Sequence, residues 1–210
     1  MPGIAVAALP PDVRKGSTFP ERTLTTFFGE AAPRWAGWMP APHMDRRIVI
    51  VGFMGCGKTT VAKTLARQLG CNVIDLDSFI TEREGRSAAE IIAQDGEPSF
   101  RSVETQALGD ALENGEPHVI SLGGGAWTVE GNRALVAQHD CLSVWLDAPF
   151  ELCWERITTN PKTIRPLAPN RETAQKLHES RRASYAIAQL HVDATKDLAE
   201  IVSDITRGLA

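Results

Sequence analysis

The stretch Gly52-Phe-Met-Gly-Cys-Gly-Lys-Thr59 has the residue types and spacing for the most specific chemistry in this sequence. It fits the pattern G-x-x-x-x-G-K-[ST], a glycine-rich loop whose backbone N–H groups converge on phosphate oxygens. Lys58 would add a mobile positive charge near the β- and γ-phosphates, and the Thr59 hydroxyl could bind Mg²⁺. The pattern predicts an ATP-binding site that includes Gly55, Cys56, Gly57, Lys58, Thr59 and Thr60.

The flanking residues supply the elements that such a loop needs. A short apolar, β-branched run, Arg47-Ile-Val-Ile-Val-Gly52, leads into the loop and predicts a buried parallel strand. Val61, Leu65 and Leu69 follow it at helical spacing, and Gly70 should end that helix. Strand, loop and helix therefore occur in the order that a phosphate loop requires. A glycine turn that arose by chance is the alternative, and it would not need these flanking elements.

Strand-like and helix-like segments alternate along the rest of the chain. This alternation predicts an α/β protein with a parallel sheet covered on both faces and with ligands at the carboxyl ends of the strands. The triple glycine at 123–125 should reach the same edge as the phosphate loop, because it directly follows a predicted strand. The predicted strands are 71–75, 118–122, 141–147 and 191–192, and the helices are 78–84, 87–95, 99–114, 149–157, 171–188 and one from 197.

Composition excludes several classes of protein. The chain has 210 residues, of which 43% are hydrophobic, enough for one domain with a core. A net charge of −4 argues against a nucleic-acid or membrane-surface binder, and no apolar run approaches the roughly 20 residues that span a bilayer. The four cysteines form no C-x-x-C pair, which predicts reduced thiols in the cytoplasm. A redox switch at Cys56 is the alternative.

The first 45 residues differ in character from the rest. Seven prolines between Pro2 and Pro42, with no sustained hydrophobic period, predict a flexible N-terminal extension (1–45) before a domain at 46–210. Pro10 and Pro11 interrupt the one apolar block that could resemble a secretory signal. A transit peptide and a translation start at Met44 remain alternatives.

Further motifs follow the phosphate loop in a fixed order. With that loop they resemble the shikimate kinase family of phosphate-loop kinases, from about Arg47 to the C-terminus. The resemblance implies a three-layer α/β sandwich with a five-stranded parallel sheet in the order 2-3-1-4-5. The motifs are Asp75-Leu-Asp77, Gly96-Glu-Pro-Ser-Phe-Arg101, Leu122-Gly-Gly-Gly125, Arg165-Pro-Leu167, and Arg181 four residues before Tyr185.

The resemblance also implies an activity: ATP-dependent phosphorylation of the 3-hydroxyl of shikimate, a step in aromatic amino-acid synthesis, with Mg²⁺. We expect a cytoplasmic monomer whose partners are ATP and shikimate, with no nucleic acid and no membrane. A gluconate or related small-molecule kinase of the same fold is the rival enzyme, and an inactive nucleotide-binding regulator is the rival of another class.

Two acidic residues are candidates at the end of the second strand. Asp75 could hold Mg²⁺, usually through water because this ion sheds its hydration shell reluctantly. By resemblance, Asp77 would bind the hydroxyls of the acceptor and take up its proton as the oxygen attacks. At positions i and i+2 of a strand end the two side chains would face the same way. Either carboxylate could instead cap the following helix.

Two arginines are candidates for the carboxylate of shikimate. Arg101 lies at the front of a predicted helix, where the dipole disfavours a cation and an anionic ligand would explain it. By resemblance Arg181 is the second such arginine. The family commonly shows Arg-x-Pro-Leu-Tyr, whereas this chain has Arg181-Arg-Ala-Ser-Tyr185, so Arg182 remains an alternative. A solvated helix face is the alternative for both.

The remaining candidates also come from the resemblance. The Gly124 N–H would bind shikimate, with a plain tight turn as the alternative. Residues from about 158 to 170 would form a lid, from which Arg165 reaches the phosphates and stabilises the charge that develops during transfer. Arg156 is a weaker candidate for adenine packing. The predicted catalytic residues are Lys58, Asp77 and Arg165.

Overall fold

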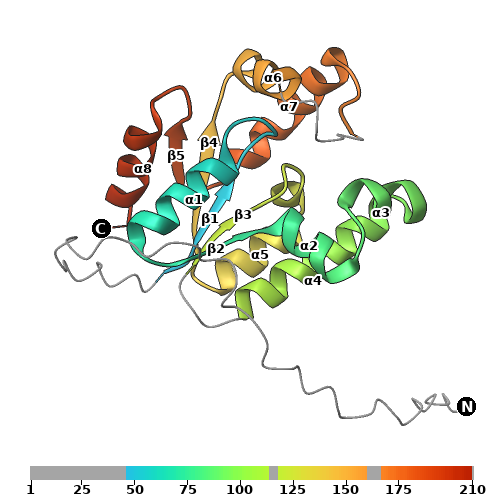
Figure 1. Cartoon of the computed structure of the whole chain (residues 1–210), viewed down its shortest axis with the longest axis horizontal. Helices are drawn as coiled ribbons and strands as arrows, with labels where there is room; N and C mark the ends of the chain where they lie inside the picture. Colours follow the sequence, from blue (N-terminus) through green and yellow to red (C-terminus); the bar gives the residue numbers. More distant parts are fainter. Residues whose placement is uncertain (1–45, 114–117, 160–166, 210) are drawn as a thin grey trace, which may run out of the picture. The chain divides into compact units, whose positions relative to one another are not determined.

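A single parallel sheet forms the centre of the protein. The computed structural model describes residues 46–113, 118–159 and 167–209 (Figure 1). Within them, five strands pair in the order β2-β3-β1-β4-β5, all parallel, which confirms the predicted α/β fold and strand order. The strands are β1 (Ile48–Val51), β2 (Asn72–Asp75), β3 (His118–Ser121), β4 (Leu142–Asp147) and β5 (Leu190–Asp193).

Helices cover both faces of this sheet. Helix α1 packs on β2, β3 and α8, while α4 packs on α5 on the other side (Figure 1). The helices are α1 (Lys58–Leu69), α2 (Leu76–Glu84), α3 (Ala88–Asp95), α4 (Glu97–Glu113), the 3₁₀ turn η1 (Ala126–Thr128), α5 (Glu130–Gln138), α6 (Phe150–Thr159), α7 (Arg171–Tyr185) and α8 (Leu198–Arg207).

The central strand β1 determines where the functional loops meet. Its four residues are at most 1% exposed, as expected for a β-branched strand buried on both faces. Its register pairs Ile50 with Ser121 of β3 and Val51 with Trp145 of β4. Because these parallel strands end together, the loops that follow β1 and β3 leave the sheet at the same edge.

Helix α1 follows its predicted pattern. Val61, Leu65 and Leu69 are buried, and Gly70 ends the helix in the left-handed conformation with φ 65°. Helix α3 likewise begins at the predicted capping box, in which Ser87 and Glu90 exchange hydrogen bonds. Local spacing was therefore a sufficient guide at these helix ends.

Two features differ from the sequence prediction. The turn η1 and helix α5 were not predicted, because Val129 caps α5 without a side-chain hydrogen bond and only Asn132 and Val136 of α5 are buried. The prediction that Asp75 and Asp77 lie together on a strand end is wrong. Strand β2 ends at Asp75, and Asp77 already belongs to the first turn of α2.

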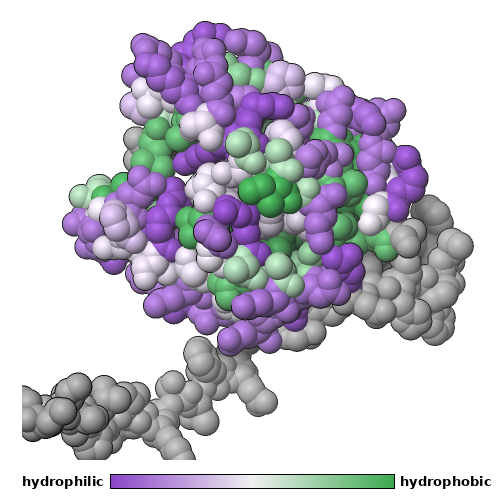
Figure 2. Space-filling model, turned by 180° about the vertical axis from the view of Figure 1, so that it is seen from behind, coloured by the Kyte–Doolittle hydropathy of each residue, from purple (hydrophilic) through white to green (hydrophobic). Residues whose placement is uncertain are grey.

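The surface carries little concentrated apolar area. Figure 2 shows a face that is mostly hydrophilic, with hydrophobic residues in small scattered groups. Among the described residues, the large hydrophobic side chains that are exposed are Val73, Ile187 and Leu198. No helix of the described residues is long and apolar enough to cross a membrane.

Candidate active site

The phosphate loop joins β1 to α1 and depends on its glycines. Gly55 and Gly57 have φ values of 79° and 105°, a region that other residues rarely adopt. A Cβ atom at Gly55 would also lie 2.6 Å from the Cys153 carbonyl oxygen. Cys56 is 2% exposed and therefore lacks the access that a redox switch needs. The backbone thus takes the path predicted for phosphate binding, at the N-terminus of α1.

Two cations lie against this loop. The Lys58 ammonium donates hydrogen bonds of 2.9 Å to the carbonyl oxygens of both Gly52 and Phe53. Arg156 donates to the Cys56 carbonyl oxygen at 3.2 Å, from helix α6. Both side chains line the pocket, so two positive charges lie beside the phosphate loop.

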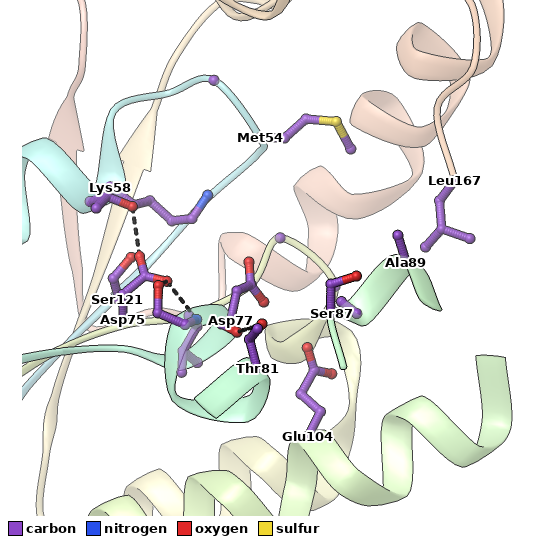
Figure 3. Close-up of a pocket in the computed structure, with 18 of the residues that line it drawn as sticks. Met54, Lys58, Asp75, Asp77, Thr81, Ser87, Ala89, Glu104, Ser121 and Leu167 are labelled. Atoms are coloured by element: carbon purple, nitrogen blue, oxygen red, sulfur yellow. Dashed lines mark hydrogen bonds between the residues drawn. The ribbon is translucent and has the colours of Figure 1, made fainter. Parts of the chain in front are cut away.

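Asp75 has two roles, one for each carboxylate oxygen. Oδ2 accepts a 2.8 Å hydrogen bond from the Thr59 hydroxyl (Figure 3). Oδ1 accepts from the Ser78 backbone N–H at 3.2 Å and so caps α2. The capping role and a location beside Thr59 therefore coexist in this residue.

The opposite end of the pocket holds two further carboxylates. A Cβ atom at Gly123 would lie 2.8 Å from Asp77 Oδ1 and 3.1 Å from Glu104 Oε1, so both side chains rest against the bare glycine backbone. Glu104 is 1% exposed, and its burial raises the pKa of its carboxyl, an effect that the Arg101 guanidinium opposes. Sequence reasoning missed Glu104, whose only signal was its position one turn after Arg101.

Arg101 has counter-charges within its own helix. Its guanidinium donates to Glu104 at 2.7 Å and to Glu97 at 2.8 Å, and its side chain is 19% exposed. The unfavourable helix dipole that singled out Arg101 is therefore offset by these two acids. Its candidacy depends instead on its location, because it lines the pocket beside Gly125.

The two adjacent arginines of α7 face different surroundings. Arg181 is 7% exposed, lines the pocket, and would lie 3.5 Å from a Cβ atom at Gly124. Arg182 forms a bidentate ion pair with Asp147, at 2.8 and 3.0 Å, and stacks over Trp145. The structure thus places Arg181 in the pocket, while Arg182 has partners of its own.

These residues line one pocket of about 880 Å³, a volume within the usual range for small-molecule sites. Figure 3 shows Lys58 and Asp75 towards one side of it, Glu104 towards the other, and Asp77 between them. Of the predicted site residues, Arg165 lies outside the described part of the chain, and Cys56 does not line the pocket. The lining also includes several residues that the sequence analysis did not assign, among them Met54, Ser87, Ile92 and Glu104.

Comparison with known proteins identifies the family. A family model described as shikimate kinase matches residues 54–210. The shikimate kinase of Cereibacter sphaeroides is 42% identical over 161 residues, which cover 75% of this chain and 79% of that protein. The shikimate kinase of Caulobacter vibrioides is 39% identical over 156 residues, covering 73% and 76%.

Solved structures agree with the sequence comparison. A shikimate kinase from Acinetobacter baumannii in complex with shikimate has a TM-score of 0.72 and 30% identity, covering 78% of this chain and 92% of that one. A gluconokinase from Sinorhizobium meliloti, with a TM-score of 0.55 and 21% identity, shares the fold alone. The extent of the family match and the identity to its members show that this chain belongs to the shikimate kinase family.

Proposed function

We propose that the protein transfers the γ-phosphoryl group of ATP to the 3-hydroxyl of shikimate, giving shikimate 3-phosphate and ADP, for aromatic amino-acid synthesis. One observation carries the proposal: a single pocket joins a phosphate loop to an acceptor end with two arginines and two carboxylates. A phosphate loop alone would fit many enzymes. The paired arginines add the selectivity, because guanidinium groups bind a carboxylate through parallel hydrogen bonds.

At the nucleotide end, the loop backbone and Lys58 hold the phosphates. The N–H groups of Gly55, Cys56, Gly57 and Thr60 would bind phosphate oxygens at the positive end of α1. Lys58 would leave the carbonyl oxygens of Gly52 and Phe53 and follow the γ-phosphoryl charge. Arg165 would approach from the lid at about 158–170 and stabilise the charge that develops during transfer.

Thr59 and Asp75 fit a magnesium ion that arrives with ATP. Their oxygens lie 2.8 Å apart at the loop, and hydroxyl and carboxylate oxygens are ligands that suit this ion. Thr59 would bind directly, and Asp75 through water, since one of its oxygens remains on the α2 cap. When bound, the ion offsets the negative charge of the phosphate oxygens.

At the acceptor end, Asp77 would orient the 3-hydroxyl and receive its proton. As the hydroxyl oxygen forms its bond to the γ-phosphorus, the bond to the β–γ bridging oxygen breaks and ADP leaves. Arg101 and Arg181 would hold the carboxylate of shikimate, and the Gly124 N–H would contact the ring substituents. Because this arrangement places one hydroxyl in line with the phosphate loop, it favours one acceptor position.

The proposal extends to the oligomeric state and the cellular location of the protein. We infer that the protein acts as a monomer in the cytoplasm, with ATP and shikimate as its partners and with neither nucleic acid nor membrane. The acidic net charge of −4 supports the absence of a polyanionic partner.

A coupled assay of ADP release tests the activity directly. The full chain is incubated with MgATP and with shikimate, with gluconate, or with no acceptor. We expect ADP release only with shikimate, together with formation of a phosphate ester at the 3-position. ADP release that depends on gluconate, or that needs no acceptor, would contradict the proposal.

Lys58→Met provides the internal control for this assay. The substitution keeps a long side chain but removes the positive charge that follows the γ-phosphoryl group. We expect the variant to fold and to lose several orders of magnitude in kcat. Near-normal turnover of a folded variant would remove Lys58 from the catalytic residues.

A further inference from the structure

Tyr185 lies beside two residues that the proposed mechanism assigns to the acceptor, Gly124 and Arg181. It is the single tyrosine of the chain and is 1% exposed, at the last residue of α7. Its hydroxyl donates a 2.5 Å hydrogen bond to the Gly124 carbonyl oxygen. Burial raises the pKa of this phenol, and the Arg181 guanidinium lies close enough to oppose the rise. The contact to Gly124 joins residues that are 61 positions apart in the sequence.

The helix geometry explains how one side chain reaches both groups. Arg181 and Tyr185 are four residues apart, so they lie one above the other on the same face of α7. That face is buried, since Arg181 is 7% exposed. The Tyr185 ring packs beside Trp145 at 6.1 Å between ring centroids, which holds the phenol in place.

Gly124 needs such an anchor. It belongs to three consecutive glycines, which have more backbone freedom than any other residue type. A Cβ atom at Gly124 would lie 3.5 Å from Arg181 Nη1 and 3.5 Å from the Met54 backbone nitrogen, so this glycine lies between the guanidinium and the phosphate loop. Any rotation of its backbone would change the distance between the acceptor and phosphate ends of the pocket.

We propose that Tyr185 is a positioning residue for the acceptor: its hydroxyl fixes the Gly124 backbone beside the Arg181 guanidinium. The inference rests on the proposed function and deepens it. Because peptide groups are planar, a bond to the Gly124 carbonyl oxygen fixes the Gly124–Gly125 peptide and so restrains the Gly124 Cα, to which the N–H group assigned to shikimate is attached. Groups that are held in their binding geometry before the ligand arrives cost less free energy to order when it binds.

Tyr185→Phe tests the role, because it removes the hydroxyl and keeps the ring. We expect the KM for shikimate to rise by up to about tenfold, which is the effect of losing one neutral hydrogen bond, while the KM for ATP stays nearly constant. Equal changes in the two constants, or no change, would overturn the inference. If the wild-type chain releases no ADP with shikimate, the proposed function itself fails, and the variant is not the cause.

Ser143→Ala is the matched control for a general loss of stability. The Ser143 hydroxyl is also buried and accepts a 3.0 Å hydrogen bond from the Gln189 backbone, but Ser143 does not line the pocket. We expect both variants to lower the Tm, and only Tyr185→Phe to raise the KM for shikimate. A similar rise in Ser143→Ala would reduce Tyr185 to an ordinary structural residue.

A double variant tests whether Tyr185 acts together with Arg181. If it does, Tyr185→Phe should raise the KM for shikimate less in an Arg181→Lys background than in the wild type. If the two substitutions instead raise this KM independently, so that their factors multiply, the coupling is contradicted.

A ¹⁹F label on Tyr185 provides a direct probe. In the full chain labelled with 3-fluorotyrosine, the one ¹⁹F signal should shift on addition of shikimate alone. A signal that saturating shikimate leaves unmoved would overturn the proposal even if Tyr185→Phe fails to fold.

Discussion

Glu104 is a carboxylate in a position where charge is costly. It is 1% exposed, it pairs with Arg101 at 2.7 Å, and its other oxygen lies near the Gly123 backbone. Burial raises the pKa of this carboxyl, the Arg101 guanidinium opposes the rise, and the nearby Asp77 carboxylate adds to it. Because the Glu104 carboxyl changes its charge with pH, both the stability of the folded protein and the position of the Arg101 guanidinium should depend on pH.

The sign of that sensitivity can be tested with Glu104→Gln. A carboxyl whose pKa is raised in the folded state stabilises the protein below its unfolded pKa, about 4.5, and this contribution is lost as pH rises through the folded pKa. The free energy of unfolding of the wild type, relative to Glu104→Gln, should therefore fall as pH increases above about 4.5. Denaturant unfolding of both proteins across this range measures it, and a difference that rises with pH would show a lowered pKa.

Gly125 illustrates how a glycine can leave room for the side chain of another residue. Its φ of −97° suits any residue, so backbone strain does not require glycine there. A Cβ atom, however, would lie 2.6 Å from Arg101 Nη1 and 2.7 Å from Arg101 Cζ. The guanidinium can occupy its observed location only because residue 125 has no side chain.

Gly125→Ala should therefore displace Arg101 without disturbing the backbone. We expect the KM for shikimate to rise by about tenfold or more, the loss of a charge-assisted hydrogen bond, with little change in the KM for ATP. Gly131→Ala is the control, because a Cβ atom there meets nothing within 4 Å in the exposed face of α5. That variant should keep both constants and gain about 0.5–1 kcal/mol of stability. Unchanged kinetics in Gly125→Ala would remove Arg101 from the acceptor site.

At the scale of single elements, α7 separates two adjacent arginines by the direction in which each side chain leaves the helix. Asn170 caps this helix by accepting a 2.9 Å hydrogen bond from the Thr173 N–H, which fixes where its turns begin. Neighbouring positions of a helix point about 100° apart. Arg181 consequently enters the pocket, whereas Arg182 reaches Asp147 at the end of β4.

Replacing each arginine by alanine tests this separation. Arg181→Ala should raise the KM for shikimate by about tenfold to over a hundredfold, since it removes a charged partner of the carboxylate. Arg182→Ala should leave that KM nearly unchanged and cost less than about 1 kcal/mol of stability, because its ion pair is partly exposed. Steady-state kinetics and thermal melts measure both effects. The reverse pattern would assign the substrate to Arg182.

At the scale of the whole molecule, the family match begins only at residue 54, and the described structure begins at residue 46. The segment 1–45 was predicted to be a flexible extension, and it lies outside the described residues. The described part already contains a five-stranded sheet and every predicted site residue except Arg165.

A chain shortened to begin at Met44 should therefore fold and phosphorylate shikimate much as the full chain does. Its Tm, its solubility and its two KM values, each compared with those of the full chain, measure this. A large fall in Tm or a loss of solubility would indicate instead that residues such as Trp35 and Trp38 pack against the domain.

The sequence alone determined the phosphate loop, most strands and helices, and the family. These features depend on local patterns: glycine spacing around Lys58, the β-branched run of β1, and the capping box at Ser87. Helix α5 was missed because it lacks such signals, and α2 was predicted to begin at Ser78 and not at Leu76 because Leu76 continues the apolar run of β2. A local sequence pattern is a poor guide to the structure of a segment when neighbouring elements supply most of its stabilising contacts.

Only the tertiary structure decided how distant residues meet. The burial of Glu104 between Arg101 and Asp77, the entry of Arg181 and not Arg182 into the pocket, and the bond from Tyr185 to Gly124 all depend on more than one element. Such contacts depend on the strand order and on the direction in which each side chain leaves its helix. Both are fixed by packing across the whole sheet, so no stretch of sequence specifies them by itself.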